Sequence, residues 1–285
     1  MAWDGLTIED IVFVHSLRGR PLVHWHTRRH THEAHEFHFF LGGSGRFENG
    51  NTTHTITGGH LFLSPPGVIH QIHPEDPEQP IAYYAVLFDA REDEDVSAIL
   101  DDRGFLGSFP VRLGTRQRLL FEDLKNKFAH PDAYRNNAAR HQFASFVYDL
   151  YAAFVEGRRV VADGDEYSVH LDRAIALFQR RIAEAVRLPE IAGAIGITPE
   201  HLIRLFSDRF GVTPMQYFRR LRMETAGSML INSRLSIKEI SYELGFSNPF
   251  HFSRSFKAFS GASPREFRRD YYRRNPMEYS TKLTD

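Results

Sequence analysis

Between Ile237 and Arg268 the chain reads I-K-E-I-S-Y-E-L-G-F-S-N-P-F-H-F-S-R-S-F-K-A-F-S-G-A-S-P-R-E-F-R. A similar stretch runs from Leu188 to Phe218 and reads L-P-E-I-A-G-A-I-G-I-T-P-E-H-L-I-R-L-F-S-D-R-F-G-V-T-P-M-Q-Y-F. The matching positions are Ile191 and Ile240, Gly196 and Gly245 and, after one inserted residue, Arg204, Phe206, Gly211 and Pro214 with Arg254, Phe256, Gly261 and Pro264. Internal similarity of this kind indicates one structural unit that occurs twice.

Each copy carries the signals of two helices joined by a sharp turn. A glycine, Gly196 or Gly245, stands where the chain must turn, and a Thr or Ser that can cap a helix follows it. The second helix of each copy ends at another glycine, Gly211 or Gly261. This order predicts a helix-turn-helix unit in each copy.

The second helix of each unit is expected to bury one face and to expose the other. The residues expected to be buried are Leu202, Leu205, Phe206 and Phe210 in the first unit and Phe252, Phe256 and Phe259 in the second. The side chains left to project are Glu200, Ile203 and Arg204 in the first unit and Asn248, Phe250, His251 and Arg254 in the second. Because Arg binds guanine, and Asn or His can hydrogen-bond base edges, we expect these projecting side chains to read DNA.

A further helix is predicted between the two units. Thr213 is a capping residue, Pro214 suits a first helical turn, and the helical pattern runs to about Ile231. Such a helix is about 27 Å long. It would hold two recognition helices about 34 Å apart, which is one turn of DNA, so one chain would enter two successive major grooves.

The net charge of -1 hides a difference between the two halves of the chain. Residues 1–169 hold 16 Lys and Arg against 24 Asp and Glu, a net charge of -8, whereas residues 170–275 hold 18 against 10, a net charge of +8. Fourteen of the 16 histidines precede residue 171. The basic half suits a polyanion such as DNA, and the histidine-rich half is expected to do different chemistry.

On these residues, the segment 170–275 resembles the DNA-binding domain of the AraC/XylS family of bacterial transcription regulators. The resemblance places the base-contacting positions on Glu200, His201, Ile203 and Arg204, and on Pro249, Phe250, His251 and Arg254. It implies a double-stranded operator as partner, RNA polymerase as a further partner, transcription activation, and a homodimer. Arg222, Lys238, Lys257, Arg265, Arg268 and Arg269 are candidates to contact phosphates, and solvated surface charges are the alternative for each.

The first half of the chain has the pattern of antiparallel β-structure. Short apolar or alternating runs are separated by glycine and proline turn signals, and Asn49-Gly50 favours a tight hairpin. The runs are Ile11–Val14, Phe37–Leu41, Thr52–Thr57, His60–Leu63 and Ile81–Phe88. They predict a small barrel or sandwich.

After Gly114 the apolar spacing becomes helical. Amphipathic helices are predicted over 116–129 and 138–155, and their apolar faces either pack on the barrel or form part of a dimer interface. Residues 156–167 are polar and contain glycine, which is typical of a linker.

Four residues of the first half match the metal-ligand spacing of the cupin superfamily, which residues 20–90 resemble: His30, His32, Glu36 and His70. Three imidazoles and a carboxylate suit Zn²⁺, Ni²⁺, Fe²⁺ or Mn²⁺. Three interpretations stay open: an effector pocket whose polar residues hydrogen-bond a sugar or related metabolite, a bound metal alone or beneath such a ligand, and purely structural histidines. Trp25 is a candidate to stack on a sugar ring, or it belongs to the core.

The sequence therefore predicts a multidomain α+β protein, with a cupin-like antiparallel β-barrel plus helices followed by an all-α domain with two helix-turn-helix units. The expected parts are 1–112 for effector binding, 113–167 for the amphipathic helices and linker, 168–275 for DNA binding, and 276–285 as a tail. No apolar run is long enough to cross a membrane and there is no cysteine, so a cytoplasmic protein is expected. The predicted function is a ligand-gated transcription regulator rather than an enzyme, and a cupin metalloenzyme fused to a DNA-binding module is the alternative from another class.

Overall fold

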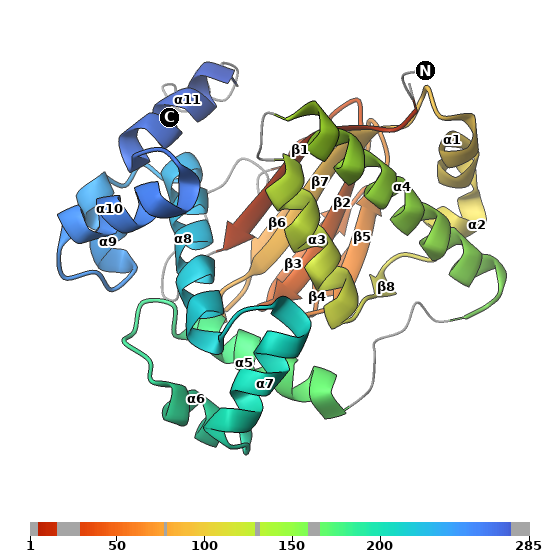
Figure 1. Cartoon of the computed structure of the whole chain (residues 1–285). Coiled ribbons are helices and arrows are strands. Elements are labelled where there is room, and N and C mark those ends of the chain that lie inside the picture. The colour runs from red at the N-terminus through yellow and green to blue at the C-terminus, as the bar shows by residue number, and fades with distance from the viewer. Residues whose placement is uncertain (1–4, 16–28, 77–78, 129–131, 159–165, 275–285) are drawn as a thin grey trace. The chain divides into compact units, whose positions relative to one another are not determined.

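The sheets and helices predicted from the sequence appear in a computed structural model that describes residues 5–15, 29–76, 79–128, 132–158 and 166–274 (Figure 1). Contacts divide the chain into two units, and the division falls between Asp172 and Arg173. The sequence placed the start of the second domain at residue 168, and that boundary stays a prediction. Each unit is described by itself.

The first unit contains a five-stranded antiparallel sheet with the strand order β1-β7-β2-β5-β8. Its strands are β1 (Thr7–His15), β2 (His35–Gly42), β5 (His60–Ser64), β7 (Ala82–Asp89) and β8 (Val111–Arg112). β2 lies in the middle, because it pairs with β7 on one side and with β5 on the other. Side chains of β2 therefore alternate between the two faces of the sheet at its centre.

A second antiparallel sheet has the order β4-β3-β6 and faces the first. It consists of β3 (Gly45–Asn49), β4 (Thr52–Ile56) and β6 (His70–Pro74). β3 and β4 form the hairpin predicted at Asn49-Gly50, where Gly50 has a φ of 61°. The core between the sheets takes side chains from both, including Phe40, Phe62 and Tyr83 of the first and Phe47 and Ile72 of the second.

Helices cover the other face of the larger sheet (Figure 1). α1 (Glu94–Asp101) and α2 (Arg103–Leu106) precede the two longer helices α3 (Thr115–Phe128) and α4 (Ala133–Val155), which match the two amphipathic helices predicted from the sequence. Phe143 of α4 packs against Phe37 and Phe88 of the sheet, with ring centroids 5.9 and 4.9 Å apart. Phe121 of α3 lies 5.0 Å from Phe39. The apolar faces of both helices thus pack on the barrel.

The second unit is all helical. Its elements are α5 (Glu166–Arg180), which belongs to this unit from Arg173 on, α6 (Leu188–Ile195), α7 (Pro199–Phe210), α8 (Pro214–Asn232), α9 (Ile237–Glu243), α10 (Pro249–Ser260) and α11 (Pro264–Arg274). The pairs α6–α7 and α9–α10 are the two predicted helix-turn-helix units. Phe178 of α5 packs on Phe206 of α7 and Phe218 of α8, so α5 completes the core around the α6–α7 pair.

α8 is the connecting helix predicted between the two units. Thr213 and Gln216 form a capping box at its start, where the Thr213 side chain accepts a hydrogen bond from the Gln216 backbone. Its 19 residues make it about 28 Å long. α7 of the first helix-turn-helix unit packs against α8, and so do α9 and α10 of the second unit and the final helix α11. Most of its side chains from Leu221 to Ile231 are buried, so both helix pairs share this helix as their core.

Two expectations about single elements differ from the structure. The strands β6 and β8 and the helices α1 and α2 were absent from the prediction, and β3 was implied only by the hairpin at Asn49-Gly50, because these short elements carry few apolar residues in a regular spacing. Phe259 was expected to point inward, but its side chain is 42% exposed, because it lies in the last turn of α10, where the buried face defined by Phe252 and Phe256 ends. No helix in the part of the chain that the structure describes is long and apolar enough to span a membrane.

Candidate functional site

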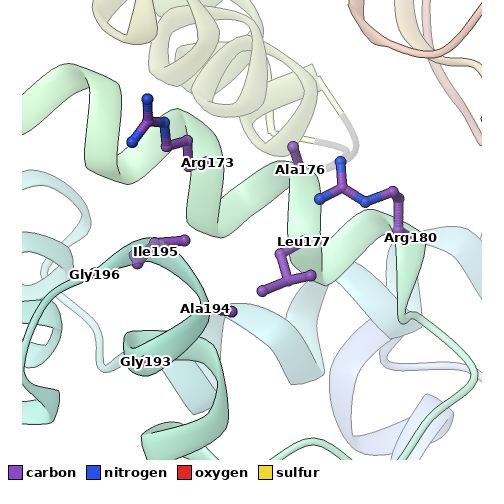
Figure 2. A pocket seen from close by; sticks show the side chains of 8 residues that line it. All are labelled: Arg173, Ala176, Leu177, Arg180, Gly193, Ala194, Ile195 and Gly196. Atoms are coloured by element: carbon purple, nitrogen blue, oxygen red, sulfur yellow. The ribbon is translucent and has the colours of Figure 1, made fainter.

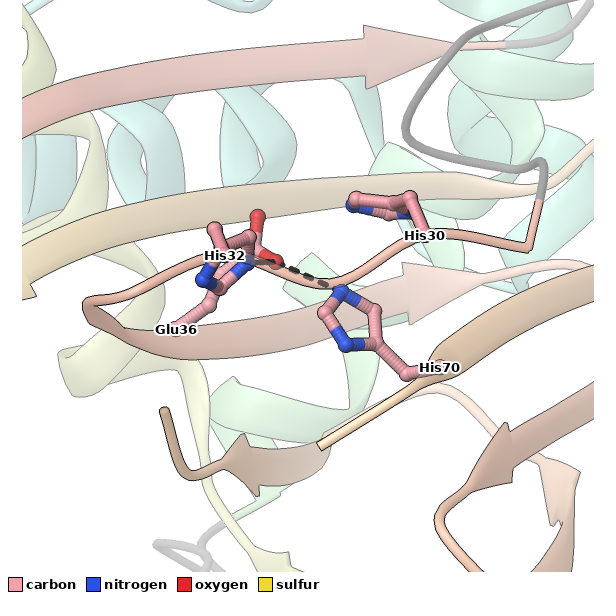
Figure 3. A group of neighbouring side chains, drawn as sticks. All are labelled: His30, His32, Glu36 and His70. Atoms are coloured by element: carbon pink, nitrogen blue, oxygen red, sulfur yellow. Dashed lines mark hydrogen bonds and ion pairs between the residues drawn. The ribbon is translucent and has the colours of Figure 1, made fainter. Parts of the chain in front are cut away.

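His30, His32, Glu36 and His70 converge inside the first unit (Figure 3). Each offers one ligand atom, and these four atoms all lie within 4.8 Å of one another. Oε2 of Glu36 lies 2.9 Å from Nε2 of His32 and 3.0 Å from Nε2 of His70. The structure therefore brings together all four residues that the cupin-like spacing predicted.

Backbone pairing explains how residues so distant in the chain meet. His30 and His70 form an antiparallel bridge, in which each backbone N–H donates to the carbonyl oxygen of the other at 3.1 and 3.0 Å. Glu36 is the second residue of β2, and its carboxylate is fully buried. His70 begins β6 in the opposite sheet. The cluster consequently spans both sheets of the barrel.

Hydrogen bonds to the backbone fix the protonation of two of these imidazoles. Nδ1 of His32 lies 2.9 Å from the carbonyl oxygen of Ala34, and Nδ1 of His70 lies 3.0 Å from the carbonyl oxygen of Val68. A carbonyl oxygen can only accept, so both Nδ1 atoms carry the proton. In a neutral imidazole the lone pair is then on Nε2, which is the atom that faces Glu36.

This arrangement fits a divalent cation. Two Nε2 lone pairs and a carboxylate oxygen, all acceptors, point at the same small space, and a cation or added protons must offset their repulsion. Metal-ligating histidines commonly donate their other N–H to a backbone carbonyl, as His32 and His70 do here. The donor set of three imidazoles and a carboxylate suits Zn²⁺, Fe²⁺, Ni²⁺ or Mn²⁺.

Protonation provides the same compensation when the site holds no cation. Burial lowers the pKa of His32, but the hydrogen bond and charge attraction of Glu36 outweigh burial, and the pKa is raised overall. An imidazolium at His32 can donate from Nε2 to Glu36. A metal ion would therefore have to displace a proton from this residue, which makes its affinity depend on pH.

His38 is a member of this site that the sequence did not assign. It is two residues after Glu36 on β2 and faces the same side of the sheet. Its side chain is fully buried, and its Nε2 lies 3.4 Å from Oε2 of Glu36. The sequence did contain a signal for His38, because alternate residues of a strand share a face and His38 is two residues after Glu36. Trp25, the predicted sugar-stacking residue, lies outside the described residues.

Glycines and capping residues shape the two helix-turn-helix turns of the second unit. Gly196 and Gly245 end the first helix of each pair in the left-handed region, with φ of 81° and 74°. Thr198 caps α7 by accepting a hydrogen bond from the His201 backbone, as the sequence predicted. Asn248 caps α10, since its side-chain oxygen accepts from the Phe250 backbone at 2.8 Å. This leaves the amide nitrogen of Asn248 for contact with DNA.

The residues predicted to read bases lie on the outer faces of α7 and α10. In α7, Glu200, Ile203 and Arg204 are exposed and His201 is half-buried. In α10, the exposed residues are Phe250, His251, Arg254 and Lys257, with Asn248 just before the helix, and Pro249 is half-buried. The side chain of Phe250 is 79% exposed and lies beside the exposed His251 and Arg254, so it is accessible to a bound molecule.

Two arginines that were candidates for phosphate contact are used by the fold. Arg222 of α8 donates to the carbonyl oxygens of Ile182 and Glu184 at 2.9 and 2.7 Å. Arg268 of α11 donates to the carbonyl oxygens of Leu230 and Leu235 at 2.8 and 2.7 Å. The sequence could not separate these guanidiniums from surface charges, because their carbonyl partners are 33 or more residues away.

A shallow pocket lies between α5 and α6 of the second unit (Figure 2). Ala176 and Leu177 of α5 line it together with Gly193, Ala194, Ile195 and Gly196. Arg173 and Arg180 flank it from the same face of α5, seven residues apart. This pocket consists of residues outside the exposed faces of α7 and α10.

Comparisons with known proteins identify both units. Residues 20–144 match the family described as the AraC-like ligand binding domain, and residues 191–270 match the family described as a helix-turn-helix domain. The chain is 25% identical over 274 residues to the HTH-type transcriptional regulator YfiF of Bacillus subtilis, covering 92% of this chain and 85% of that protein. It is 24% identical over 236 residues to the Msm operon regulatory protein of Streptococcus mutans, covering 82% and 83%.

Among solved structures, an AraC-type transcriptional regulator from Chromobacterium violaceum is 32% identical, with a TM-score of 0.34, over 35% of this chain and 89% of that one. The two family matches, the full-length relatives and the order of a β-barrel before paired helix-turn-helix units agree with one another. This chain belongs to the AraC/XylS family of DNA-binding transcription regulators and carries the family's ligand-binding domain at its N-terminal end.

Proposed function

We propose that this regulator binds paired operator half-sites through α7 and α10 and that a small ligand at the His30, His32, Glu36 and His70 cluster controls this binding. The observation that carries the proposal is the buried cluster itself. Acceptor atoms from both sheets of the ligand-binding domain converge on one space there. Three imidazoles and one carboxylate whose ligand atoms lie within 4.8 Å of one another form a donor set that suits a divalent cation.

Exposure and charge support DNA contact through α7 and α10. Arg204 and Arg254 are exposed at equivalent positions of the repeat, and neither has an ion-pair partner among the described residues. Each is therefore available to guanine in a major groove. Phe250 and Ile203 suit contact with thymine methyl groups, and Lys257 suits a phosphate.

Selection from a pool of DNA duplexes tests this step. The full-length chain should enrich one sequence that it binds at least about a thousand times more tightly than a scrambled duplex. The logarithm of the binding constant should fall linearly with the logarithm of the salt concentration. An absence of salt-dependent binding to any duplex would overturn the proposal.

A divalent metal is the ligand that the cluster itself supports best, so a metal-responsive regulator is one form of this function. A sugar or related metabolite is the other form, and the similarity to the lactose operon transcription activator of Staphylococcus xylosus supports it, at 22% identity over 82% of this chain. The two forms are compatible where an organic ligand binds beside the cation. A cupin metalloenzyme has less support, because the chain's relatives are transcriptional regulators.

Thermodynamic linkage gives a direct test of control. If Zn²⁺, Ni²⁺, Fe²⁺ or Mn²⁺ changes the affinity for the selected duplex by some factor, the duplex must change the affinity for that metal by the same factor. Fluorescence anisotropy with the metal present and with a chelator measures the first factor, and metal titration with and without the duplex measures the second. Equal DNA affinity at saturating metal and in chelator would exclude metal control.

The outer face of α4 supports the expected homodimer. The exposed positions along one face of this helix are Ala138, His141, Ser145, Tyr148, Ala152 and Val155. In a two-fold symmetric dimer such a face can pack against the same face of a second chain. Val155 is 65% exposed and Tyr148 40% exposed, although the opposite face of α4 is packed on the barrel. Val155→Glu should therefore shift the sedimentation coefficient toward that of a monomer.

A further inference from the structure

The barrel interior beside the four-residue cluster holds two buried hydroxyl groups. Ser64 of β5 and Tyr83 of β7 are both fully buried. Neither Oγ of Ser64 nor the hydroxyl of Tyr83 has a hydrogen-bond partner among the described residues. Leaving a buried hydroxyl without a partner costs about 1–3 kcal/mol, so two such groups in one region call for an explanation.

Strand register places Ser64 next to the cluster. In the pairing of β2 with β5, Ser64 lies directly opposite Glu36. Residues directly opposite on antiparallel strands project to the same face, with Cβ atoms about 5 Å apart. Phe62, two residues earlier on β5, packs on Phe40 and Phe47 of the core, so this face of β5 is the interior one. The Ser64 hydroxyl is thus inside the barrel beside the Glu36 carboxylate.

Tyr83 approaches the same space from the other side of β2. It pairs with Phe40, and its ring centroid lies 5.8 Å from that of His38, the histidine that contacts Glu36. Burial, and then the charge of Glu36, raise the pKa of Tyr83 well above its ordinary value, so the hydroxyl keeps its proton and remains a donor. The residue opposite His38 on β7 is Ala85, a small side chain between Tyr83 and the cluster.

The charge of the occupied site selects the ligand class. A divalent cation bound to three neutral imidazoles and one carboxylate leaves a net charge of +1, which favours an anion. A cation that takes six donors also has two positions left beside four protein ligands. The buried hydroxyls of Ser64 and Tyr83 lie on the two sides of β2, and both can donate to the oxygen atoms of such an anion.

We propose that the effector is a small carboxylate that gives two oxygen atoms to the bound cation and accepts hydrogen bonds from the hydroxyls of Ser64 and Tyr83. This inference rests on the proposed function, since it requires a cation at His30, His32, Glu36 and His70. It assigns Ser64 and Tyr83 to effector binding, and it explains why two donors are buried with no hydrogen-bond partner in the part of the chain that the structure describes. A neutral sugar would gain little from the net positive charge.

Cobalt absorbance tests the inference on the full-length chain, with oxalate as the probe. Oxalate should change the visible spectrum of the cobalt-loaded protein saturably. Tyr83→Phe and Ser64→Ala should each lower the affinity for oxalate by about tenfold or more, as expected for a lost hydrogen bond to a charged group. Both variants should bind one cobalt per chain as the unchanged protein does. Tyr84→Phe is the matched control, because Tyr84 faces α3 on the opposite side of β7.

Stability gives a second readout that separates a ligand contact from a structural role. Tyr83→Phe and Ser64→Ala should leave the melting temperature of the metal-free chain unchanged or slightly raised, because each removes an unpaired buried hydroxyl. A marked fall in melting temperature would show that these hydroxyls hold the fold, which overturns their assignment to the effector.

The cobalt titration also separates this inference from the proposal on which it rests. Cobalt binding with no response to oxalate would overturn the carboxylate effector and leave the metal site standing. Failure to bind cobalt would reject the metal site, and the effector assignment with it. A saturable response to L-arabinose without one to oxalate would overturn the anion class alone.

Discussion

Nε2 of His70 lies 3.0 Å from Oε2 of Glu36, although 34 residues separate them in the chain. Both atoms are fully buried, and the Nδ1 of His70 is committed to the carbonyl oxygen of Val68. The contact therefore joins the two sheets of the barrel through a pair of groups that both prefer to accept a hydrogen bond. We therefore expect replacement of the Glu36 carboxylate to affect both the barrel and its metal site.

Glu36→Gln should abolish metal binding, and at a pH above the raised pKa of His32, where that imidazole is neutral, it should raise the stability of the metal-free chain. The new amide group can donate to the Nε2 atoms of His32 and His70, which the carboxylate cannot do, and one added hydrogen bond contributes about 1 kcal/mol. The same change removes the only carboxylate among the four predicted ligands. Thermal unfolding in chelator and elemental analysis after dialysis against Zn²⁺ measure the two effects.

Glu48→Gln is the control for this experiment, since Glu48 pairs with His73 on the partly exposed side of β3. It should change neither metal content nor the unfolding temperature by more than a degree or so, because exposed ion pairs contribute about 0–1 kcal/mol. Full retention of metal by the Glu36→Gln chain would show that the cation binds elsewhere.

Arg254→Ala and Lys257→Ala should weaken DNA binding in different ways. Loss of a guanidinium that reads guanine should cost about 1–3 kcal/mol on the selected duplex and relax the base preference at one position. Loss of a phosphate contact should weaken all duplexes alike and lower the salt slope by about 1. Anisotropy on the selected and scrambled duplexes at several salt concentrations distinguishes the two. An equal loss on both duplexes in the Arg254→Ala chain would count against base reading there.

The two turn glycines should differ in their tolerance of alanine. Both have positive φ, which costs about 1 kcal/mol or more for any other residue. A methyl group at Gly196 meets open space, whereas at Gly245 it would overlap the carbonyl oxygen of Ala183. Gly245→Ala should therefore lower the free energy of unfolding by clearly more than Gly196→Ala, by about 2 kcal/mol. Urea denaturation of the two variants measures the difference, and equal losses would show that the segment around Ala183 can move away.

His15 should make the stability of the first unit depend on pH. Burial, and then the charge of Arg118, lower its pKa from 6.5 to about 4, so it is neutral in the folded state. The unfolded chain binds a proton at His15 below pH 6.5 while the folded chain does not. The stability that His15 provides is complete above pH 6.5 and is lost as the pH falls toward 4.

Between pH 7.5 and pH 5 this loss should amount to about 2 kcal/mol. His15→Leu removes this titration, so the variant does not lose the corresponding stability at low pH. Relative to the unchanged chain, the variant should therefore be more stable at pH 5 than at pH 7.5 by about 2 kcal/mol. Urea denaturation at both pH values gives the comparison. A difference that does not vary with pH would show that His15 is accessible to protons in the folded chain.

The sequence predicted the second unit better than the first. Its helices are long, their caps and glycines are local signals, and the repeat supplies each signal twice, as Thr198 and Gly196 illustrate. In the barrel, β6 was missed and β3 was implied only by its hairpin, because Gly45–Asn49 and His70–Pro74 contain few apolar residues, and their place depends on pairing with each other. Phe259 was misplaced because helical spacing alone does not show how far the core reaches along α10.

The candidate metal ligands were predicted from their spacing, and the structure brings them together. The parts of the site that the sequence did not indicate depend on register between distant strands. Ser64 gains its place from lying opposite Glu36, and His38 and Tyr83 from facing the same interior. The roles of Arg222 and Arg268 were missed for a related reason, since their partners are backbone carbonyls, which every residue possesses.

The burial of α8 has a consequence for the promoters that this regulator controls. Because α7 and α10, the two helices proposed to read DNA, pack on one shared helix, their separation is set by the protein interior and not by a flexible tether. Base changes at a promoter can be absorbed by the loss of single contacts. A change in the number of base pairs between the two recognised segments rotates one away from the other by about 34–36° per pair, and the protein has no means to follow.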